Sequence, residues 1–460
     1  MKLCDTIAAI STPRGQGGVA IIRISGADAI EVGDRVFSAV NKKPLSAFES
    51  GRLCYGEIKM PTGETVDNGL AAVFFGPRSF TGEDTVEINC HGGALITEKV
   101  LSAVLSAGAR AAEAGEFTRR AYVNGKMRLT EAEALGQLLS AVSDSQLKLA
   151  RSGVRGILAD KIDGIYADLL ITLTSIYAAI DFPDEDLSEM SREEICHAVE
   201  TALLQIRKLS ATYSTGRAIN EGVLTVICGR TNAGKSSVYN RILGYDAAIV
   251  TDIEGTTRDL LRETATLGKT LLRLCDTAGL RKTDDTVESI GIERTRGEME
   301  RAELILAVFD RSRPLIEEDI SLAREVANTG ATTVALFNKS DADRVCDMSE
   351  VECLFEHKMN ISAKDGQGFS ELADLIDRLF IDGEIEIGND AVVTGARQYA
   401  SLVSSASALS SALEDLRADI PLDLCCVAVE NALSFLGEAD GRELGEEIIS
   451  EIFSRFCVGK

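Results

Sequence analysis

Three patterns of apolar residues follow one another along the chain, and they differ in the spacing of those residues. Up to residue 125 the apolar runs are short or alternating and are separated by glycine turns, as in VAIIRISG, GLAAVFFG and TVEINCHGG; such runs predict β-strands. Over 126–220 the spacing becomes helical, beginning at LTEAEALGQLLSAV, where Thr130 and Glu133 have the spacing of a capping box. Residues 221–380 alternate strand-like and helix-like runs, and a helical pattern returns over 381–460.

The order of these patterns along the chain predicts an inserted domain. Alternating strands and helices over 221–380 are typical of a parallel α/β sheet. Because helical segments lie on both sides of that block, we expect one all-α domain, formed by 126–220 and 381–460, that is interrupted by an α/β domain. Residues 1–125 form a separate β-rich domain in this interpretation. The expected fold class is therefore α/β multidomain.

The stretch VICGRTNAGKSSVYNRILG opens the inserted block and contains a phosphate-loop pattern. Gly229, followed after four residues by Gly234-Lys235-Ser236, fits G-x-x-x-x-G-K-[ST]. The apolar run 223–228 before it predicts a buried strand, and a helix-like pattern follows it. In that context backbone N–H groups and the helix N-terminus bind phosphates, Lys235 reaches the outer phosphates, and Ser236 holds a magnesium ion.

Further nucleotide motifs follow in a fixed order. Thr257 in GTTRD is suited to closing over a γ-phosphate and its magnesium ion, and LLRLCDTAG delivers Asp276 to the metal shell and Gly279 to the γ-phosphate. TVALFNKSD then carries Asn338, Lys339 and Asp341, and NISAKDG carries Ser362, Ala363 and Lys364. N-K-x-D alone is a weak pattern, but all five elements in this order predict a GTP site.

Asp341 decides which base the site accepts. Its carboxylate can accept hydrogen bonds from both the guanine ring N–H and the exocyclic amine, while Lys339 packs across the base. Adenine lacks both donors, and a site built on such hydrogen bonds rejects an analogue without them by roughly 10⁴-fold. We therefore expect binding of GTP and GDP.

The hydrolytic apparatus differs from that of Ras-type enzymes. Leu280 follows the D-T-A-G motif at the position where those enzymes have the glutamine that orients the attacking water. Acidic residues that could replace it lie in the next segment, RKTDDTVESIGIER. Composition does not choose among them, and they are Asp284, Asp285, Glu288 and Glu293.

Charge and cysteine content restrict the classes of function. The net charge of −24 argues against nonspecific coating of nucleic acid. Residues 1–126 hold 14 basic and 14 acidic residues, so the rest of the chain carries the whole net charge. No apolar run approaches ~18 residues, so we expect no membrane span, and the early charges argue against a secretory signal. Eleven cysteines without C-x-x-C spacing suit reduced thiols in a cytoplasmic protein.

The densest basic cluster lies at the end of the N-terminal region. It is either a local RNA contact or an ordinary solvated face, and its members are Arg110, Arg119, Arg120, Lys126 and Arg128.

The motifs together resemble one family, the tRNA modification GTPases called MnmE or TrmE. The resemblance covers essentially the whole chain and rests on RGQGGVAIIRISG, FTGEDTVEINCHGG, GEFTRRAYVNGKM, DFPDED, GRTNAGKSS, TDIEGTTRD, DTAGLR, VESIGIER and FCVGK. It implies an N-terminal domain that binds folate and forms a homodimer, a helical domain, and a GTPase domain inserted in it. It also implies GTP-driven addition of an aminomethyl-type group to carbon 5 of the wobble uridine in tRNA. The partner implied is the FAD-dependent protein MnmG (GidA), and the one-carbon donor is a tetrahydrofolate derivative.

The resemblance also implies roles for individual residues. Glu288 would be the general base or would orient the water, and Asn232 would bind a potassium ion together with Thr251, Ile253 and Thr256. Arg258 is an alternative source of that positive charge. Arg23, Glu83, Lys126 and Lys460 would contact 5-formyl-tetrahydrofolate or a related compound. The family's nucleotide site further includes Ala233, Ser237, Asp252, Glu254, Gly255, Thr277 and Ala278.

A second function, a regulatory GTPase of ribosome assembly, has the same nucleotide motifs. The flanking regions favour the tRNA-modification interpretation, because no basic RNA-binding module follows the GTPase block and the N-terminal and C-terminal motifs match MnmE.

Overall fold

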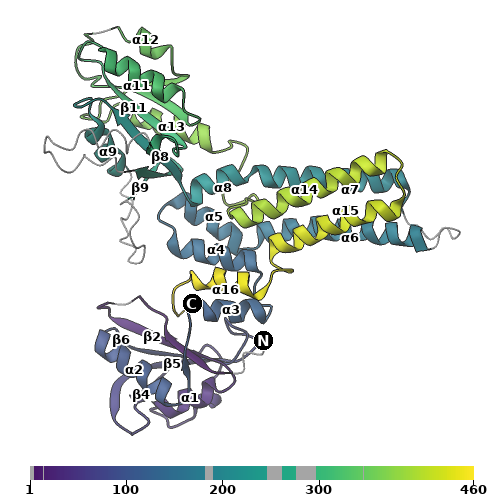
Figure 1. The fold of residues 1–460 in the computed structure, drawn as a ribbon. Coiled ribbons are helices and arrows are strands. Elements are labelled where there is room, and N and C mark those ends of the chain that lie inside the picture. The colour runs from purple at the N-terminus through teal and green to yellow at the C-terminus, as the bar shows by residue number, and fades with distance from the viewer. Residues whose placement is uncertain are drawn as a thin grey trace. The chain divides into compact units, whose positions relative to one another are not determined.

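The structure, a computed structural model, divides into two compact units (Figure 1). One unit contains residues 1–136 and 440–460, and the other contains residues 137–439. The described residues are 5–13, 15–181, 190–245, 262–275, 297–345 and 347–459.

The N-terminal unit is built on a seven-stranded sheet with the strand order β3-β4-β5-β6-β2-β1-β7. Along β2 (Val19–Ser25), Ile22 and Ile24 are fully buried on the face covered by the first two helices, and Arg23 points to the opposite face. A small apolar cluster around Phe117 packs on that opposite face. The other elements of the sheet and its helices are β1 (Ile7–Ile10), α1 (Ala29–Val36), β3 (Phe37–Ala39), η1 (Leu45–Ala47), β4 (Cys54–Lys59), β5 (Thr65–Phe74), β6 (Thr85–His91), α2 (Ala94–Ser106) and β7 (Arg110–Ala111).

Three helices, α3 (Glu116–Val123), α4 (Leu129–Ser140) and α16 (Glu446–Ser454), complete this unit around the buried Phe453. The capping box predicted at Thr130 is wrong, because α4 begins one residue earlier and Thr130 lies inside the helix. Its hydroxyl donates to the buried carboxylate of Asp440 at 3.2 Å. The Thr130 hydroxyl thus bonds to a residue 310 positions away in the sequence and not to the start of its own helix.

The C-terminal tail returns to the N-terminal sheet within the same chain. Val458 pairs with Ala114 in an antiparallel bridge, and the Ser11 hydroxyl donates to the carbonyl of Gly459 at 3.1 Å. Gly459 has φ +100°, and a Cβ on it would lie 2.1 Å from the Ile10 carbonyl oxygen. Only glycine fits such a position.

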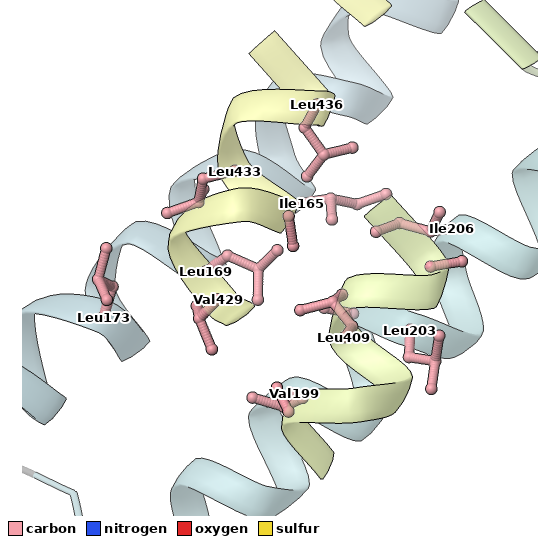
Figure 2. Packing of buried hydrophobic residues seen from close by; sticks show 14 of the residues in the cluster. Ile165, Leu169, Leu173, Val199, Leu203, Ile206, Leu409, Val429, Leu433 and Leu436 are labelled. Carbon is pink, nitrogen blue, oxygen red and sulfur yellow. The ribbon is translucent and has the colours of Figure 1, made fainter. Parts of the chain in front are cut away.

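The second unit contains a helical bundle and the inserted sheet. The bundle consists of α6 (Ile157–Asp181), α7 (Arg192–Ala211), α14 (Ala396–Arg417) and α15 (Leu422–Asp440), preceded by α5 (Asp144–Val154). Figure 2 shows aliphatic side chains of all four long helices, among them Leu169, Leu203, Leu409 and Leu433, meeting in one core. Helices α5 and α7 each open with a capping box, at Ser143 and Ser191.

Helix α6 is long and apolar enough to cross a membrane by length and composition alone, the one such helix in the described residues. This is weak evidence, because the core helix of a bundle passes the same test. Here α6 places Ile165, Leu169 and Leu173 in the bundle core.

The inserted domain is a six-stranded sheet with the order β13-β12-β11-β8-β10-β9, parallel except for the β9–β10 pair. The predicted buried strand is confirmed as β8 (Val223–Gly229), whose residues are buried as far as Cys228 because helices cover both faces. The other elements are α9 (Lys235–Leu243), β9 (Arg262–Leu267), β10 (Thr270–Cys275), β11 (Leu304–Asp310), α11 (Glu317–Ala327), β12 (Thr332–Asn338), α12 (Ser349–Glu352), β13 (His357–Asn360) and α13 (Phe369–Phe380).

The chain enters and leaves the inserted domain along two segments that are hydrogen-bonded to each other. On α8 (Tyr213–Asn220) and just before it, Thr215 and Thr212 accept through their hydroxyls from the backbone N–H groups of Asp382 (2.9 Å) and Val393 (3.0 Å). The expected α/β multidomain fold with an interrupted helical domain is therefore confirmed.

Candidate nucleotide-binding site

The phosphate loop connects β8 to α9 at the carboxyl edge of the inserted sheet. Gly234, the N-cap residue of α9, has φ +101°, and a Cβ there would lie 2.1 Å from the Asn338 side-chain nitrogen. A Cβ on Gly229 would lie 2.4 Å from the Val308 carbonyl oxygen. Gly234 is therefore required by the close approach of the Asn338 side chain and Gly229 by that of β11, as well as by the turn itself.

The two polar side chains at the start of α9 lie where the phosphate-loop pattern predicts them. Lys235 donates from Nζ to the carbonyl of Arg230 at 2.9 Å, so its ammonium lies over the loop. Ser236 follows in the first helical turn and is partly exposed. Its hydroxyl oxygen is a hard ligand of the kind that suits magnesium.

Asn338 connects the phosphate loop with the loop after β13, which carries Ser362, Ala363 and Lys364. It ends β12 and is 2% exposed. Its amide nitrogen donates to the Ala233 carbonyl at 3.0 Å, and its amide oxygen accepts from the Ala363 N–H at 3.1 Å. One side chain thus fixes two loops that lie more than 100 residues apart in the sequence.

Asp341 is held in place by Ser362 and Lys364 of the loop after β13. The hydroxyl of the buried Ser362 donates to Asp341 Oδ1 at 2.9 Å, and Lys364 Nζ lies 3.9 Å from Oδ2. The Ser362 hydrogen bond lowers the pKa of the Asp341 carboxyl, so the group is ionised at neutral pH. An ionised, partly exposed carboxylate is the acceptor that a guanine edge requires.

One residue at this edge of the sheet belongs to none of the nucleotide motifs. Asp310, the last residue of β11, forms an ion pair through Oδ2 with Lys339 Nζ at 2.5 Å, and the same ammonium donates to the Asn232 carbonyl at 3.2 Å. An acidic residue after an apolar strand is too common for the sequence alone to single it out.

The other residues predicted for the nucleotide site lie outside the part of the chain that the structure describes. They are Thr251, Asp252, Ile253, Glu254, Gly255, Thr256, Thr257, Arg258, Asp276, Thr277, Ala278, Gly279, Leu280, Asp284, Asp285, Glu288 and Glu293. No cluster of three or more His, Cys, Asp or Glu suited to a metal occurs among the described residues.

Three of the four residues predicted to bind folate, Arg23, Glu83 and Lys126, lie in the described part of the N-terminal unit. Arg23 binds Glu87 Oε1 through Nε at 2.9 Å and lies over the Phe80 ring, 5.4 Å from its centroid. Glu83 accepts from Ser25 at 2.8 Å and from the fully buried Arg120 at 3.2 Å. Lys126 is exposed and donates to the Pro77 carbonyl at 2.8 Å. Lys460 lies outside the described residues and follows directly on the docked Gly459.

Most of the basic cluster is engaged within the unit. Arg120 contacts the carboxylates of Asp5, Glu83 and Glu116 with no side-chain exposure. Arg110 forms ion pairs with Asp5 and Glu116, and Arg128 lies 4.0 Å from the carboxylate of Glu131. Lys126 donates to the backbone carbonyl of Pro77. The cluster therefore gives little support to the RNA-contact interpretation.

A mostly parallel sheet with a phosphate loop after β8, and with the N-K-x-D and S-A-K motifs after β12 and β13, defines a P-loop GTPase. Comparison with known proteins gives the particular family. Residues 6–126 match the family described as GTP-binding protein TrmE N-terminus, and residues 129–457 match the MnmE helical domain.

Relatives named tRNA modification GTPase MnmE match over the full length. The protein of Geobacillus kaustophilus is 40% identical, with 99% of each chain covered, and that of Bacillus subtilis is 38% identical, with 99% of this chain and 100% of the relative covered. The chain belongs to the MnmE family and is a GTPase of tRNA modification. Among solved structures, Aquifex aeolicus Era bound to GDP.AlF4- matches at 21% identity and a TM-score of 0.27, over 40% of this chain and 66% of that chain.

Proposed function

We propose that this chain uses GTP hydrolysis to drive addition of an aminomethyl-type group at carbon 5 of the wobble uridine in tRNA, with a tetrahydrofolate one-carbon unit and the flavoprotein MnmG (GidA) as partner. The observation that carries the proposal is the combination of two sites in one chain. Asn338 links the phosphate loop to the loop after β13, and Arg23, Glu83 and the docked tail all belong to the N-terminal unit.

In the nucleotide site, Ser236 would bind magnesium together with Thr257, and Asn232 would bind potassium together with the Thr251–Thr256 segment. Asn232 suits this role because it is exposed on the phosphate loop and its amide oxygen is a hard ligand. Glu288 would orient or deprotonate the attacking water, since Leu280 cannot. Glu288 would thus take the role that the glutamine has in Ras-type enzymes, and potassium would supply the positive charge that an arginine supplies in other GTPases.

In the folate site, Glu83 would accept hydrogen bonds from the pterin ring. Its carboxylate already accepts from Ser25 and Arg120, and these two contacts leave acceptor capacity on a carboxylate with about four lone-pair sites. The buried Arg120 also forms an ion pair with Glu83 on the face that carries the Phe117 cluster. The exposed ammonium of Lys126 is suited to the anionic glutamate tail of the folate.

The N-terminal sheet also offers a surface for the proposed homodimer. Tyr55 on β4 and Leu70 on β5 lie directly opposite each other and are 58% and 37% exposed, and the backbone N–H of the exposed Val40 is bonded to the Tyr55 carbonyl. Adjacent exposed apolar side chains mark contact surfaces. A cytoplasmic location fits the nine free cysteine thiols in the described part of the chain.

The experiment that tests the proposal is nucleoside mass spectrometry of tRNA from cells that lack this chain. Loss of the carbon-5 substituent from wobble uridines, restored by the wild-type chain, is the expected result. Unchanged wobble uridines would contradict the proposal and favour the ribosome-assembly switch.

The potassium site has its own test. GTP hydrolysis should be faster in potassium than in sodium at equal ionic strength, and Asn232→Ala should remove the difference between the two salts. Equal rates in both salts for the wild-type chain would exclude a potassium site at Asn232.

A further inference from the structure

The carboxyl end of β11 contributes a side chain to the base-reading edge that no nucleotide motif includes. In the parallel register, Asp310 lies opposite Asn338 on β12. Its side chain is 11% exposed, and Oδ2 lies 2.5 Å from the ammonium of Lys339. A nearly buried carboxylate therefore touches the lysine expected to cover the guanine base.

Lys339 itself adopts an unusual backbone conformation. Its φ is +64°, and that of Asn232 on the phosphate loop is +66°; non-glycine residues rarely adopt this left-handed region. The Lys339 ammonium donates to the Asn232 carbonyl at 3.2 Å, so the two strained residues are joined to each other. Such conformations persist where the surroundings hold them, and they concentrate at functional sites.

Asp310 is well placed to hold this arrangement because its two oxygens have separate partners. Oδ1 accepts from the backbone N–H of Ser312 at 2.9 Å and from its hydroxyl at 2.6 Å. Oδ2 is left for Lys339, with the largely exposed Arg313 farther away at 3.6 Å. Burial raises the pKa of the Asp310 carboxyl, but the hydrogen bonds from Lys339 and Ser312 lower it by more. The net pKa is below the usual value, so the group is ionised at neutral pH.

We infer that Asp310 is a positioning residue for guanine-nucleotide binding, acting through Lys339. It fixes the lysine ammonium against the phosphate-loop carbonyl of Asn232, which sets the aliphatic stem of Lys339 in place before the base arrives. A lysine side chain has many rotamers, and ordering it in advance removes that cost from binding. Asp310 touches neither base nor phosphate in this arrangement.

The test is the affinity of the full-length chain for a fluorescent GDP. Asp310→Asn keeps the size of the side chain but removes its charge, so a charged hydrogen bond to Lys339 is replaced by a weaker one to an amide oxygen. The dissociation constant should rise about 5- to 30-fold, which corresponds to about 1–2 kcal/mol. The chain offers a matched control in Asp347, whose Oδ1 accepts from the Ser349 N–H at 3.0 Å in the same kind of turn, with 79% side-chain exposure. Asp347→Asn should change the constant less than twofold.

Two further measurements separate positioning from a general structural effect. In a Lys339→Ala background, Asp310→Asn should change GDP affinity less than twofold. The ratio of affinities for GDP and IDP should stay as in the wild-type chain, because Asp341 still reads the exocyclic amine. Three results would each overturn the inference. They are an unchanged GDP affinity in Asp310→Asn, the same 5- to 30-fold loss of GDP affinity when Asp310→Asn is added to Lys339→Ala, and a ratio of GDP to IDP affinity near one. None of these readouts involves tRNA or folate, so they remain separate from the proposed modification activity.

Discussion

Replacing Asn338 with alanine should uncouple the phosphate loop from the loop after β13. The variant loses two hydrogen bonds, to the Ala233 carbonyl at 3.0 Å and from the Ala363 N–H at 3.1 Å, at a position only 2% exposed. Each bond contributes ~0.5–1.5 kcal/mol net, and a buried partner left unsatisfied costs more, up to ~3 kcal/mol. We therefore expect a total loss of about 2–4 kcal/mol, which corresponds to a roughly 30- to 1,000-fold weaker GDP affinity.

The assay is equilibrium titration of the full-length chain with fluorescent GDP, with circular dichroism to confirm that the helical bundle is intact. Asn240→Ala is the matched control, because Asn240 lies exposed on α9 close to the same loop. A GDP affinity within threefold of the wild type for Asn338→Ala would refute the claim that this side chain organises both loops.

Four further predictions follow from the two sites. Asp341→Asn should shift the preference from guanine to xanthine nucleotides, whose ring carbonyl replaces the amine; a variant that still prefers GTP in competition assays would show that Asp341 does not read the base. Glu288→Ala should slow GTP turnover at least ~10²-fold with GDP binding kept, and a small change would direct attention to the neighbouring acidic residues. Glu116→Gln should destabilise the N-terminal unit by about 3–5 kcal/mol at pH 7, because it breaks a buried ion pair. Burial raises the pKa of the Glu116 carboxyl, but the arginine contacts lower it overall, so its contribution is present above pH ~4.3 and is lost as the pH falls below it; urea unfolding of the variant should show a weaker acid dependence, and an identical profile would contradict the network. Deleting 457–460 should weaken tetrahydrofolate binding in calorimetry and leave basal GTP hydrolysis nearly intact, whereas unchanged folate affinity would exclude the tail from the site.

The sequence predicted the features that depend on local pattern. The phosphate loop was predictable because its glycines, lysine and serine have a fixed spacing between a strand and a helix, and the structure places β8 and α9 there. The interrupted helical domain was predictable because the spacing of apolar residues changes twice. Both signals arise from neighbours along the chain.

Features that depend on distant neighbours were not predictable in the same way. Thr130 has the spacing of a cap, yet its hydroxyl binds Asp440, because the chain end folds back beside α4. The basic cluster was open to two interpretations, an RNA contact or a solvated face, but its member Arg120 is buried and contacts Asp5, Glu83 and Glu116. These carboxylates are 4 to 115 residues away in the sequence, and only the fold brings them together.

The central claim, that the nucleotide site drives tRNA modification, is tested most directly by complementation. Cells that lack this chain would be supplied with the wild type or with Lys235→Ala, and their tRNA analysed by nucleoside mass spectrometry. We predict that the wild type restores the carbon-5 substituent of wobble uridines and that Lys235→Ala, expressed at the same level, leaves them unmodified. Full restoration by Lys235→Ala would contradict the account.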